Sequence, residues 1–248
     1  RRMSRDHPDR RGAERTIGFT ANHLRERTAG PFYTHPVDPQ HSHVIFKNLS
    51  LLEPLGSRDV RVSFPLEIPD SAAADQVRTR FHGEPYAVIN PGAAWPNKRW
   101  PPDRFGALGA TLRDRSGLRP LVLGGPTEQP LAQQVAEASA GAAEPAPATS
   151  ISDLFAISRT ARILISGDTG PLHIGGAVGT PLVALFGPTR TERNGPWSTA
   201  DRVLARTESC SCLYKRRCRR DAPCIDEIQL PEVVDAVERR LSMTYGAA

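Results

Sequence analysis

From Gly83 onward, short apolar runs alternate with segments of helical character, and this alternation constrains the fold more than any other feature of the chain. Strands that alternate with helices of this length form a parallel sheet that is covered by helices on both faces. The sequence therefore predicts an α/β, Rossmann-like domain. The predicted strands are 86–90, 119–123, 162–166 and 182–186, and the predicted helices are 102–112, 128–138, 152–158 (capped by Ser152) and 172–178.

The segment before Gly83 lacks this rhythm, and we assign 1–82 to a separate, partial domain that precedes the Rossmann-like domain over 83–230. Its first fifteen residues are charged and aperiodic, which predicts poor order. The remaining predictions for this part are a loop over 35–39, a helix over 44–55 that ends at Gly56, a half-exposed strand over 60–64 and a helix over 70–81. A closing helix and tail occupy 231–248, with an apolar stripe formed by Leu230, Val233, Val234, Val237 and Leu241.

The octet from Ser166 to His173 is typical of a buried strand that runs directly into a helix. Asp168 or Thr169 can cap that helix, and Pro171 suits its first turn, where no amide hydrogen is needed. The carboxyl edge of a parallel sheet and the helix amino terminus together form an anion pocket, which predicts a phosphorylated sugar or nucleotide as the ligand. The alternative is an ordinary, well-capped helix.

Two more predicted strands end in polar residues at the same edge. After the first, Gly92 allows close backbone approach to a phosphate, while Lys98 and Arg99 can neutralise it. After the second, Glu128 can hold ribose hydroxyls, or it can simply stabilise the start of the next helix. A solvated surface charge is the alternative for Lys98. The chain has no G-x-G-x-x-G after its first strand, no Walker loop and no Asp-x-Asp pair, so we expect no dinucleotide cofactor and no divalent metal.

Composition is that of a soluble globular protein, with 39% hydrophobic and 24% charged residues among 248. The sequence shows no apolar stretch long enough for a membrane helix and no visible signal peptide, so we expect a cytoplasmic location. The net charge is +5, and lysine occurs only at Lys47, Lys98 and Lys215. A basic surface suits an anionic substrate or an anionic lipid face.

A set of motifs along the chain resembles the heptosyltransferases of glycosyltransferase family 9, over about residues 17–241. In the predicted Rossmann-like domain the matching segments are 90–92, 98–101, 124–128, 167–173, 186–189 and 194–197; upstream they are 17–19, 24–26, 32–35 and 51–56.

The resemblance implies a GT-B fold, in which the second domain binds the sugar nucleotide and the first binds the acceptor. It also implies inverting, metal-independent transfer of heptose from an ADP-heptose donor to the lipopolysaccharide inner core, with peripheral contact at the inner membrane. By position, Lys98 would steady the diphosphate and Glu128 the ribose, and the phosphate and heptose would contact Asp168, Thr169, Gly170 and His173.

Two departures from the family pattern shape our expectations. Relatives often carry hydroxyl side chains shortly before the lysine, whereas this chain has Ala93 and Ala94, so contacts there would come from the backbone of residues 92–94. The family's general base, an aspartate in a Gly-rich loop, has no counterpart before Ile17. We therefore expect an amino-terminally truncated chain that binds a sugar nucleotide but transfers slowly or not at all.

The four cysteines, Cys210, Cys212, Cys218 and Cys224, lie in one arginine-rich segment and offer a different hypothesis. Four thiols can hold a zinc ion, although this spacing is not that of a zinc ribbon, and a structural role without metal is our first expectation. The competing function classes are a non-catalytic sugar-nucleotide binder and a zinc-stapled basic module for nucleic acid. The second would need stacking aromatics near the arginines, and only Tyr214 is close, so no nucleic-acid partner is expected.

Overall fold

The computed structural model describes residues 13–57 and 62–246. Contacts between Cα atoms divide the chain between Ser63 and Phe64 into two compact units, which are described separately below. The helix α2, Ala72–Arg80, confirms the helix predicted over 70–81 and belongs to the second unit by these contacts. The predicted disorder at the amino terminus falls largely on residues 1–12, outside the described part.

The first unit is built around two short parallel strands, β1 (Ile17–Phe19) and β2 (His35–Val37). The prediction of a loop over 35–39 is wrong for residues 35–37, which form β2. The strand has only three residues, and the prolines at 36 and 39 favour a loop by local pattern. Around it lie the 3₁₀ turns η2 (Ala21–His23) and η3 (Arg27–Phe32).

The helix predicted over 44–55 is present in two parts: α1 (Val44–Leu49) continues into the 3₁₀ helix η4 (Ser50–Leu55). Gly56 ends it in the left-handed region at φ +86°, as the helix-stop prediction requires. The strand predicted over 60–64 falls partly outside the described residues, and Val62–Phe64 do not form a strand.

The second unit contains a six-stranded, fully parallel sheet in the order β5-β4-β3-β6-β7-β8. Two strands match their predicted bounds, β3 (Tyr86–Asn90) and β7 (Leu182–Phe186). The two edge strands were not predicted, because one is very short and the other is only partly buried. The remaining strands are β4 (Arg119–Val122), β5 (Glu144–Pro145), β6 (Ile163–Gly167) and β8 (Arg202–Ala205).

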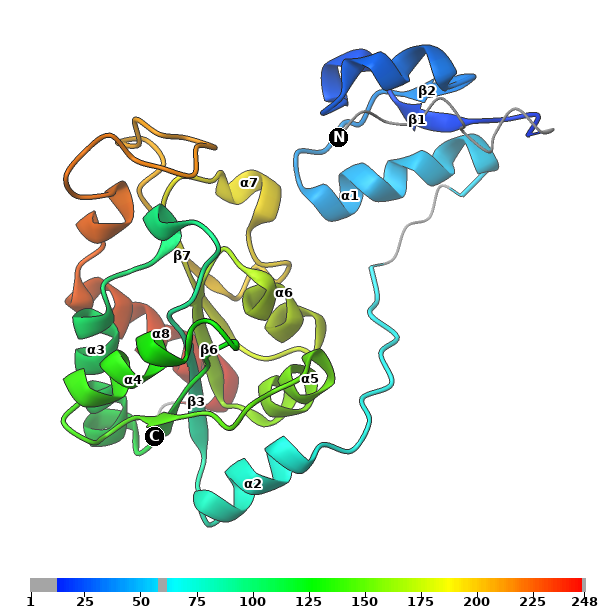
Figure 1. The fold of residues 1–248 in the computed structure, drawn as a ribbon. Helices are drawn as coiled ribbons and strands as arrows, with labels where there is room; N and C mark the ends of the chain where they lie inside the picture. Colours follow the sequence, from blue (N-terminus) through cyan, green and yellow to red (C-terminus); the bar gives the residue numbers. More distant parts are fainter. Residues whose placement is uncertain (1–12, 58–61, 247–248) are drawn as a thin grey trace. The chain divides into compact units, whose positions relative to one another are not determined.

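Helices cover both faces of this sheet (Figure 1), as the sequence predicts. Successive residues of a strand face opposite sides, so Ala87 and Ile89 pack toward one core while Tyr86 and Val88 pack toward the other. One core includes residues of α3 (Pro102–Ser116), α4 (Gln129–Ala138) and α8 (Leu230–Tyr245). The other includes residues of α2, α5 (Ile151–Thr160) and α6 (Gly170–Ala177).

Helix α8 confirms the apolar stripe predicted near the end of the chain. Val233 and Val237 are fully part of the core, and the other stripe residues pack against it while partly exposed. The cap predicted at Ser152 is wrong. The α5 cap is Ser150, which forms a reciprocal capping box with Asp153 and so starts the helix one residue earlier than predicted.

Three short helical segments complete the second unit: η5 (Pro96–Lys98), α7 (Thr191–Asn194) and η6 (Cys224–Glu227). No helix within the described ranges is long and apolar enough to cross a membrane.

Candidate functional site

The candidate site lies where the strand order reverses, between β3 and β6. From β3 the chain moves outward to β4, and it later returns to place β6 on the other side of β3. In open parallel sheets this reversal leaves a crevice beyond the carboxyl ends of the two strands, where ligands bind. Asn90, at the end of β3, bridges the crevice: its Nδ2 donates to Ser166 Oγ at 2.9 Å and to Thr169 Oγ1 at 3.0 Å.

A cavity of about 300 Å³ opens at this point. It brings together residues from all three strand ends that the sequence singled out, because the segments after β3, β4 and β6 all contribute to its wall. Of the residues predicted to contact the donor, His173 and Arg99 do not line it. The lining residues are Asn90, Gly92, Ala93, Ala94, Trp95, Lys98, Glu128, Asp168, Thr169, Gly170 and Pro171.

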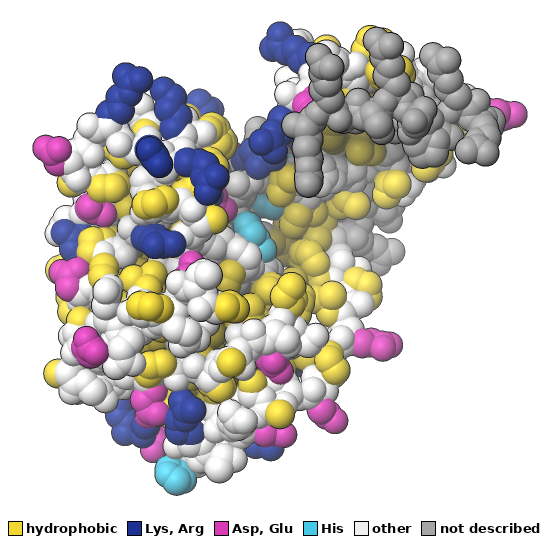
Figure 2. All heavy atoms as spheres, in the orientation of Figure 1, with side chains coloured by type: hydrophobic (Ala, Val, Ile, Leu, Met, Phe, Trp, Pro, Cys, Tyr) yellow, Lys and Arg dark blue, Asp and Glu magenta, His cyan; other side chains and the backbone are white. Residues whose placement is uncertain are grey.

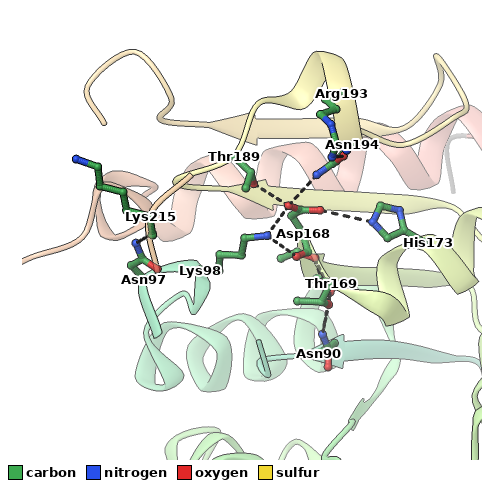
Figure 3. A network of polar contacts seen from close by, with 12 residues as sticks. Asn90, Asn97, Lys98, Asp168, Thr169, His173, Thr189, Arg193, Asn194 and Lys215 are labelled. Carbon is green, nitrogen blue, oxygen red and sulfur yellow. Dashed lines mark hydrogen bonds and ion pairs between the residues drawn. The ribbon is translucent and has the colours of Figure 1, made fainter. Parts of the chain in front are cut away.

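Lys98 and Asp168 form the centre of the polar network in this cavity (Figure 3). The Lys98 ammonium lies 2.6 Å from Asp168 Oδ2 and also donates to the backbone oxygen of Asp168 at 3.2 Å. It lies 4.8 Å from the centre of the Trp95 ring, a cation–π contact that helps to fix the lysine stem. Both charged side chains are largely withdrawn from solvent, with exposed fractions of 14% and 5%.

Asp168 is held by several donors at once. Thr189 Oγ1 donates to Oδ2 at 2.7 Å, Asn194 Nδ2 does so at 3.4 Å, and His173 Nε2 lies 3.5 Å from Oδ1, on the opposite side of the carboxylate from Lys98 (Figure 3). Burial alone would raise the pKa of Asp168, but the contacts with His173, Lys98 and Thr189 outweigh it and hold that pKa well below its usual range. Asp168 is therefore an anion at all physiological pH values.

The contacts of Asp168 also give it a role within the protein, which is to position Lys98. Asp168 is among the residues expected to contact the phosphate and heptose, and its Oδ2 already has three donors from the protein. An ammonium has three N–H donors, and Lys98 uses two of them on Asp168, which leaves one for an incoming anion. The carboxylate thus holds Lys98 in place at the cavity wall.

Helix α6 begins at the cavity, with Thr169 at the N-cap position and Pro171 in the first turn. The position of the cap was predicted, but a side-chain cap by Asp168 or Thr169 was wrong. The Thr169 hydroxyl accepts from Asn90 and makes no cap hydrogen bond, and the Asp168 carboxylate is engaged by Lys98. The start of α6 therefore keeps the positive end of its dipole available to a ligand.

Glu128 lies against Gly92 on the cavity wall. A Cβ at Gly92 would overlap the Glu128 carboxylate, so only glycine allows this approach. Arg99 Nη2 is 3.8 Å from Glu128 Oε1, and Arg99 Nε donates to the backbone oxygen of Ala93 at 2.8 Å. Arg99 therefore supports the loop and Glu128, and it is not among the residues that line the cavity.

The cysteine segment lies next to this site through Asn97. Asn97 is buried, and its Nδ2 donates to the backbone oxygen of Lys215 at 2.9 Å and to Cys212 Sγ at 3.3 Å. Cys210 and Cys212 place their sulfur atoms 3.7 Å apart. Across residues 13–57 and 62–246, no group of three or more His, Cys, Asp or Glu side chains is arranged to hold a metal ion.

Some residues of the network carried no predicted role. Thr189 and Asn194 stand in segments that match the family pattern, yet nothing in the sequence signals that they reach a carboxylate at position 168. Trp95 and Asn97 lie within three positions of Lys98 in the sequence, and this proximity was the one available signal. The sequence predicted Asn90 at the end of a strand, but it did not predict its contacts with Ser166 and Thr169.

A parallel α/β sheet with a cavity at its strand-order reversal defines the class: a Rossmann-like fold, here of the GT-B glycosyltransferase type. The model of glycosyltransferase family 9 (heptosyltransferase) matches residues 10–222. The chain belongs to this family.

Relatives with curated descriptions agree with this membership. The chain is 33% identical over 175 residues to lipopolysaccharide heptosyltransferase 3 of Escherichia coli, a match that covers 67% of this chain and 51% of that protein. It is 25% identical over 194 residues to lipopolysaccharide heptosyltransferase 1 of Pseudomonas aeruginosa, covering 68% and 54%. The chain thus spans about half the length of the curated relatives it matches.

Solved structures show the same fold. A family 9 glycosyl transferase from Veillonella parvula has a TM-score of 0.72 and 27% identity, over 88% of this chain and 65% of that one. The E. coli heptosyltransferase WaaC with ADP has a TM-score of 0.66 and 21% identity, over 90% and 65%, and this likeness supports the fold alone.

Proposed function

We propose that this protein is a glycosyltransferase that takes heptose from an ADP-heptose donor and transfers it to an anionic glycolipid of the lipopolysaccharide inner core. Transfer inverts the anomeric carbon and needs no metal ion. The relatives named above are lipopolysaccharide heptosyltransferases, and one solved neighbour was determined with ADP. The observation that carries the proposal is the Lys98 ammonium at the wall of a cavity that α6 also faces.

The chemistry of the reaction fits this arrangement. When the bond between the anomeric carbon and ADP breaks, negative charge grows on the leaving phosphate. A positioned ammonium and a helix amino terminus stabilise that charge without reorganising, and the loss of one such donor typically slows an enzyme by about a hundredfold or more. In this proposal Lys98 contacts the diphosphate, Thr169 and Gly170 contact a phosphate through their backbone, and Glu128 binds the ribose.

The general base is assigned to neither carboxylate of the cavity. Asp168 is paired with Lys98, and its depressed pKa makes it a poor proton acceptor. Glu128 is close to Arg99, and we place the ribose against it. We therefore expect donor binding to be easier to observe with this chain than turnover. The enzyme would act in the cytoplasm, at the inner face of the membrane that carries the acceptor.

A non-catalytic sugar-nucleotide binder would use the same cavity, so the decisive first experiment concerns the ligand. Thermal shift and calorimetry with ADP, ADP-heptose, UDP-glucose and a short DNA duplex separate the classes, because a bound ligand stabilises the folded state by mass action. We expect stabilisation by ADP and ADP-heptose and little by UDP-glucose. Stabilisation by the duplex alone would contradict a sugar-nucleotide site, and release of ADP from ADP-heptose with an acceptor would separate the enzyme from the binder.

A further inference from the structure

Five cations crowd into one short stretch of the second unit that the donor cavity does not use. We call residues 214–220 the basic loop. It lies between β8 and η6, so it follows the carboxyl end of a strand, at the same edge of the sheet as the cavity. Its charged residues are Lys215, Arg216, Arg217, Arg219 and Arg220, with no acidic residue among them.

Most of this charge is uncompensated. Arg220 pairs with Glu227 at 2.6 Å. The other four cations are exposed, and no acidic side chain of the described residues lies within ion-pair distance of them. Elsewhere in this unit, arginines such as Arg113 and Arg206 have a carboxylate partner. The basic loop therefore concentrates net positive charge at one place.

The loop is held in a defined position. Tyr214 donates its backbone N–H to the oxygen of Pro188 at 2.7 Å, and Asn97 donates to the backbone oxygen of Lys215 at 2.9 Å. Figure 3 shows Asn97 between Lys215 and the neighbouring Lys98. These tethers fix the loop beside the donor site, with its cationic side chains directed to solvent.

The charges do not serve the donor. None of the five cations lines the donor cavity. Figure 2 shows dark blue side chains gathered over this part of the second unit. Tyr214, at the start of the basic loop, has 45% of its surface exposed and adds an aromatic ring with a polar tip. Several exposed cations with an amphipathic aromatic suit a surface that carries many anions.

We propose that the basic loop docks the protein on the anionic lipid headgroups of the bilayer that holds the acceptor. The proposal rests on the proposed function only in requiring a lipid-borne acceptor. Each lysine or arginine near an anionic membrane strengthens binding by about fivefold, and the attraction acts within a Debye length. The contributions of the four unpaired cations add up to a membrane contact that is strong enough to position the protein and remains reversible.

Nucleic acid is the other polyanion with which such a loop could interact, and the structure favours it less. Proteins that bind single strands place several aromatic rings along a basic groove. Here Tyr214 is the one aromatic residue within the loop, and no helix or strand presents the cations to a duplex groove. Duplex binding is therefore an outcome of the test that would contradict the proposal.

The test compares vesicle binding by variants of equal net charge. Flotation with vesicles of equimolar phosphatidylglycerol and phosphatidylcholine, or of phosphatidylcholine alone, is measured for the protein, for R216Q/R217Q/R219Q and for the control R78Q/R159Q/R239Q. The control removes three exposed arginines from helices α2, α5 and α8. ADP-induced stabilisation, measured on all three, reports separately on the donor site and on folding.

We expect binding only to the phosphatidylglycerol vesicles, weakened by added salt. The loop variant should bind about a hundredfold more weakly, and the control about as well as the unchanged protein. An equal loss of vesicle binding in the loop variant and in the control would show that only the net charge of the protein matters, and it would overturn the proposal. Vesicle binding that is unchanged in the loop variant would also overturn the proposal. The same holds if a DNA duplex displaces the protein from the vesicles and this displacement requires the same arginines. ADP stabilisation that persists in each of these cases would leave the proposed function standing.

Discussion

The ammonium of Lys98 lies 2.6 Å from the carboxylate of Asp168, although the two residues are 70 positions apart in the chain. The cation that we assign to the diphosphate is thus already paired and held within the protein. This arrangement holds Lys98 at the cavity wall without a ligand, and it avoids leaving an uncompensated charge in a largely buried place.

Replacing Asp168 with asparagine should destabilise the second unit. The change leaves the mostly buried Lys98 without its carboxylate, and breaking a buried pair from one side costs about 3 to 5 kcal/mol. Urea unfolding at neutral pH measures the effect. The matched control is Asp235→Asn, because Asp235 pairs with Arg239 on an exposed helix face and should contribute less than about 1 kcal/mol.

The difference in the free energy of unfolding between the protein and Asp168→Asn has a defined pH dependence. The folded-state pKa of Asp168 is depressed, so its contribution to stability is fully present above the unfolded pKa of about 4 and is lost as pH falls toward the folded value. The stability gap between the protein and Asp168→Asn should therefore be constant from neutral pH down to about pH 5 and shrink below pH 4. A gap that widened on acidification would contradict the depressed pKa.

Gly92→Ala should weaken ADP binding while the protein still folds. The new methyl group would displace the flexible Glu128 side chain from the wall where we place the ribose. Loss of a hydrogen bond to a charged group predicts binding about tenfold weaker or more. Gly125→Ala is the control, because its Cβ would meet the same carboxylate at an ordinary 3.4 Å. ADP affinities are measured by calorimetry. Equal affinities of the two variants for ADP would contradict the assignment of Glu128 to the donor site.

The four cysteines should differ in their rates of alkylation. Burial raises the pKa of Cys212 to about 11 and that of Cys224 to about 12, whereas the backbone N–H of Arg220 lowers the pKa of Cys218. The thiolate is the reactive form, so iodoacetamide at mildly alkaline pH should modify Cys218 before Cys212 and Cys224. Mass spectrometry of timed digests gives the order. Early modification of Cys224 in folded protein would show that this segment opens.

The sequence predicts local structure well where the pattern is strong. Strand β7 is an unbroken apolar run, β3 is one up to its final Asn90, and both were placed to the residue. All three predicted strand ends meet at one cavity. Local pattern does not predict the structure where it depends on strand pairing or on contacts with residues that are distant in the sequence. Strand β2 is three residues long and includes Pro36, so only its pairing with β1 defines it.

The same distinction separates the predicted from the unpredicted parts of the site. Lys98 and Asp168 were each singled out by their local motifs, but nothing local indicates that they bind each other. Their contact depends on the sheet order, which places β3 and β6 side by side. The contact of Asn97 with Cys212 likewise joins residues 115 positions apart.

The central claim is that Lys98 grips the diphosphate of an ADP-sugar, and calorimetry with ADP, AMP and adenosine on the protein and on Lys98→Met tests it most directly. Methionine keeps much of the stem and removes the charge. We predict that ADP binds the unchanged protein more tightly than AMP, and that Lys98→Met weakens ADP binding about 10- to 100-fold with little effect on adenosine. Unchanged ADP affinity in a folded Lys98→Met protein, checked by its circular dichroism, would contradict the account.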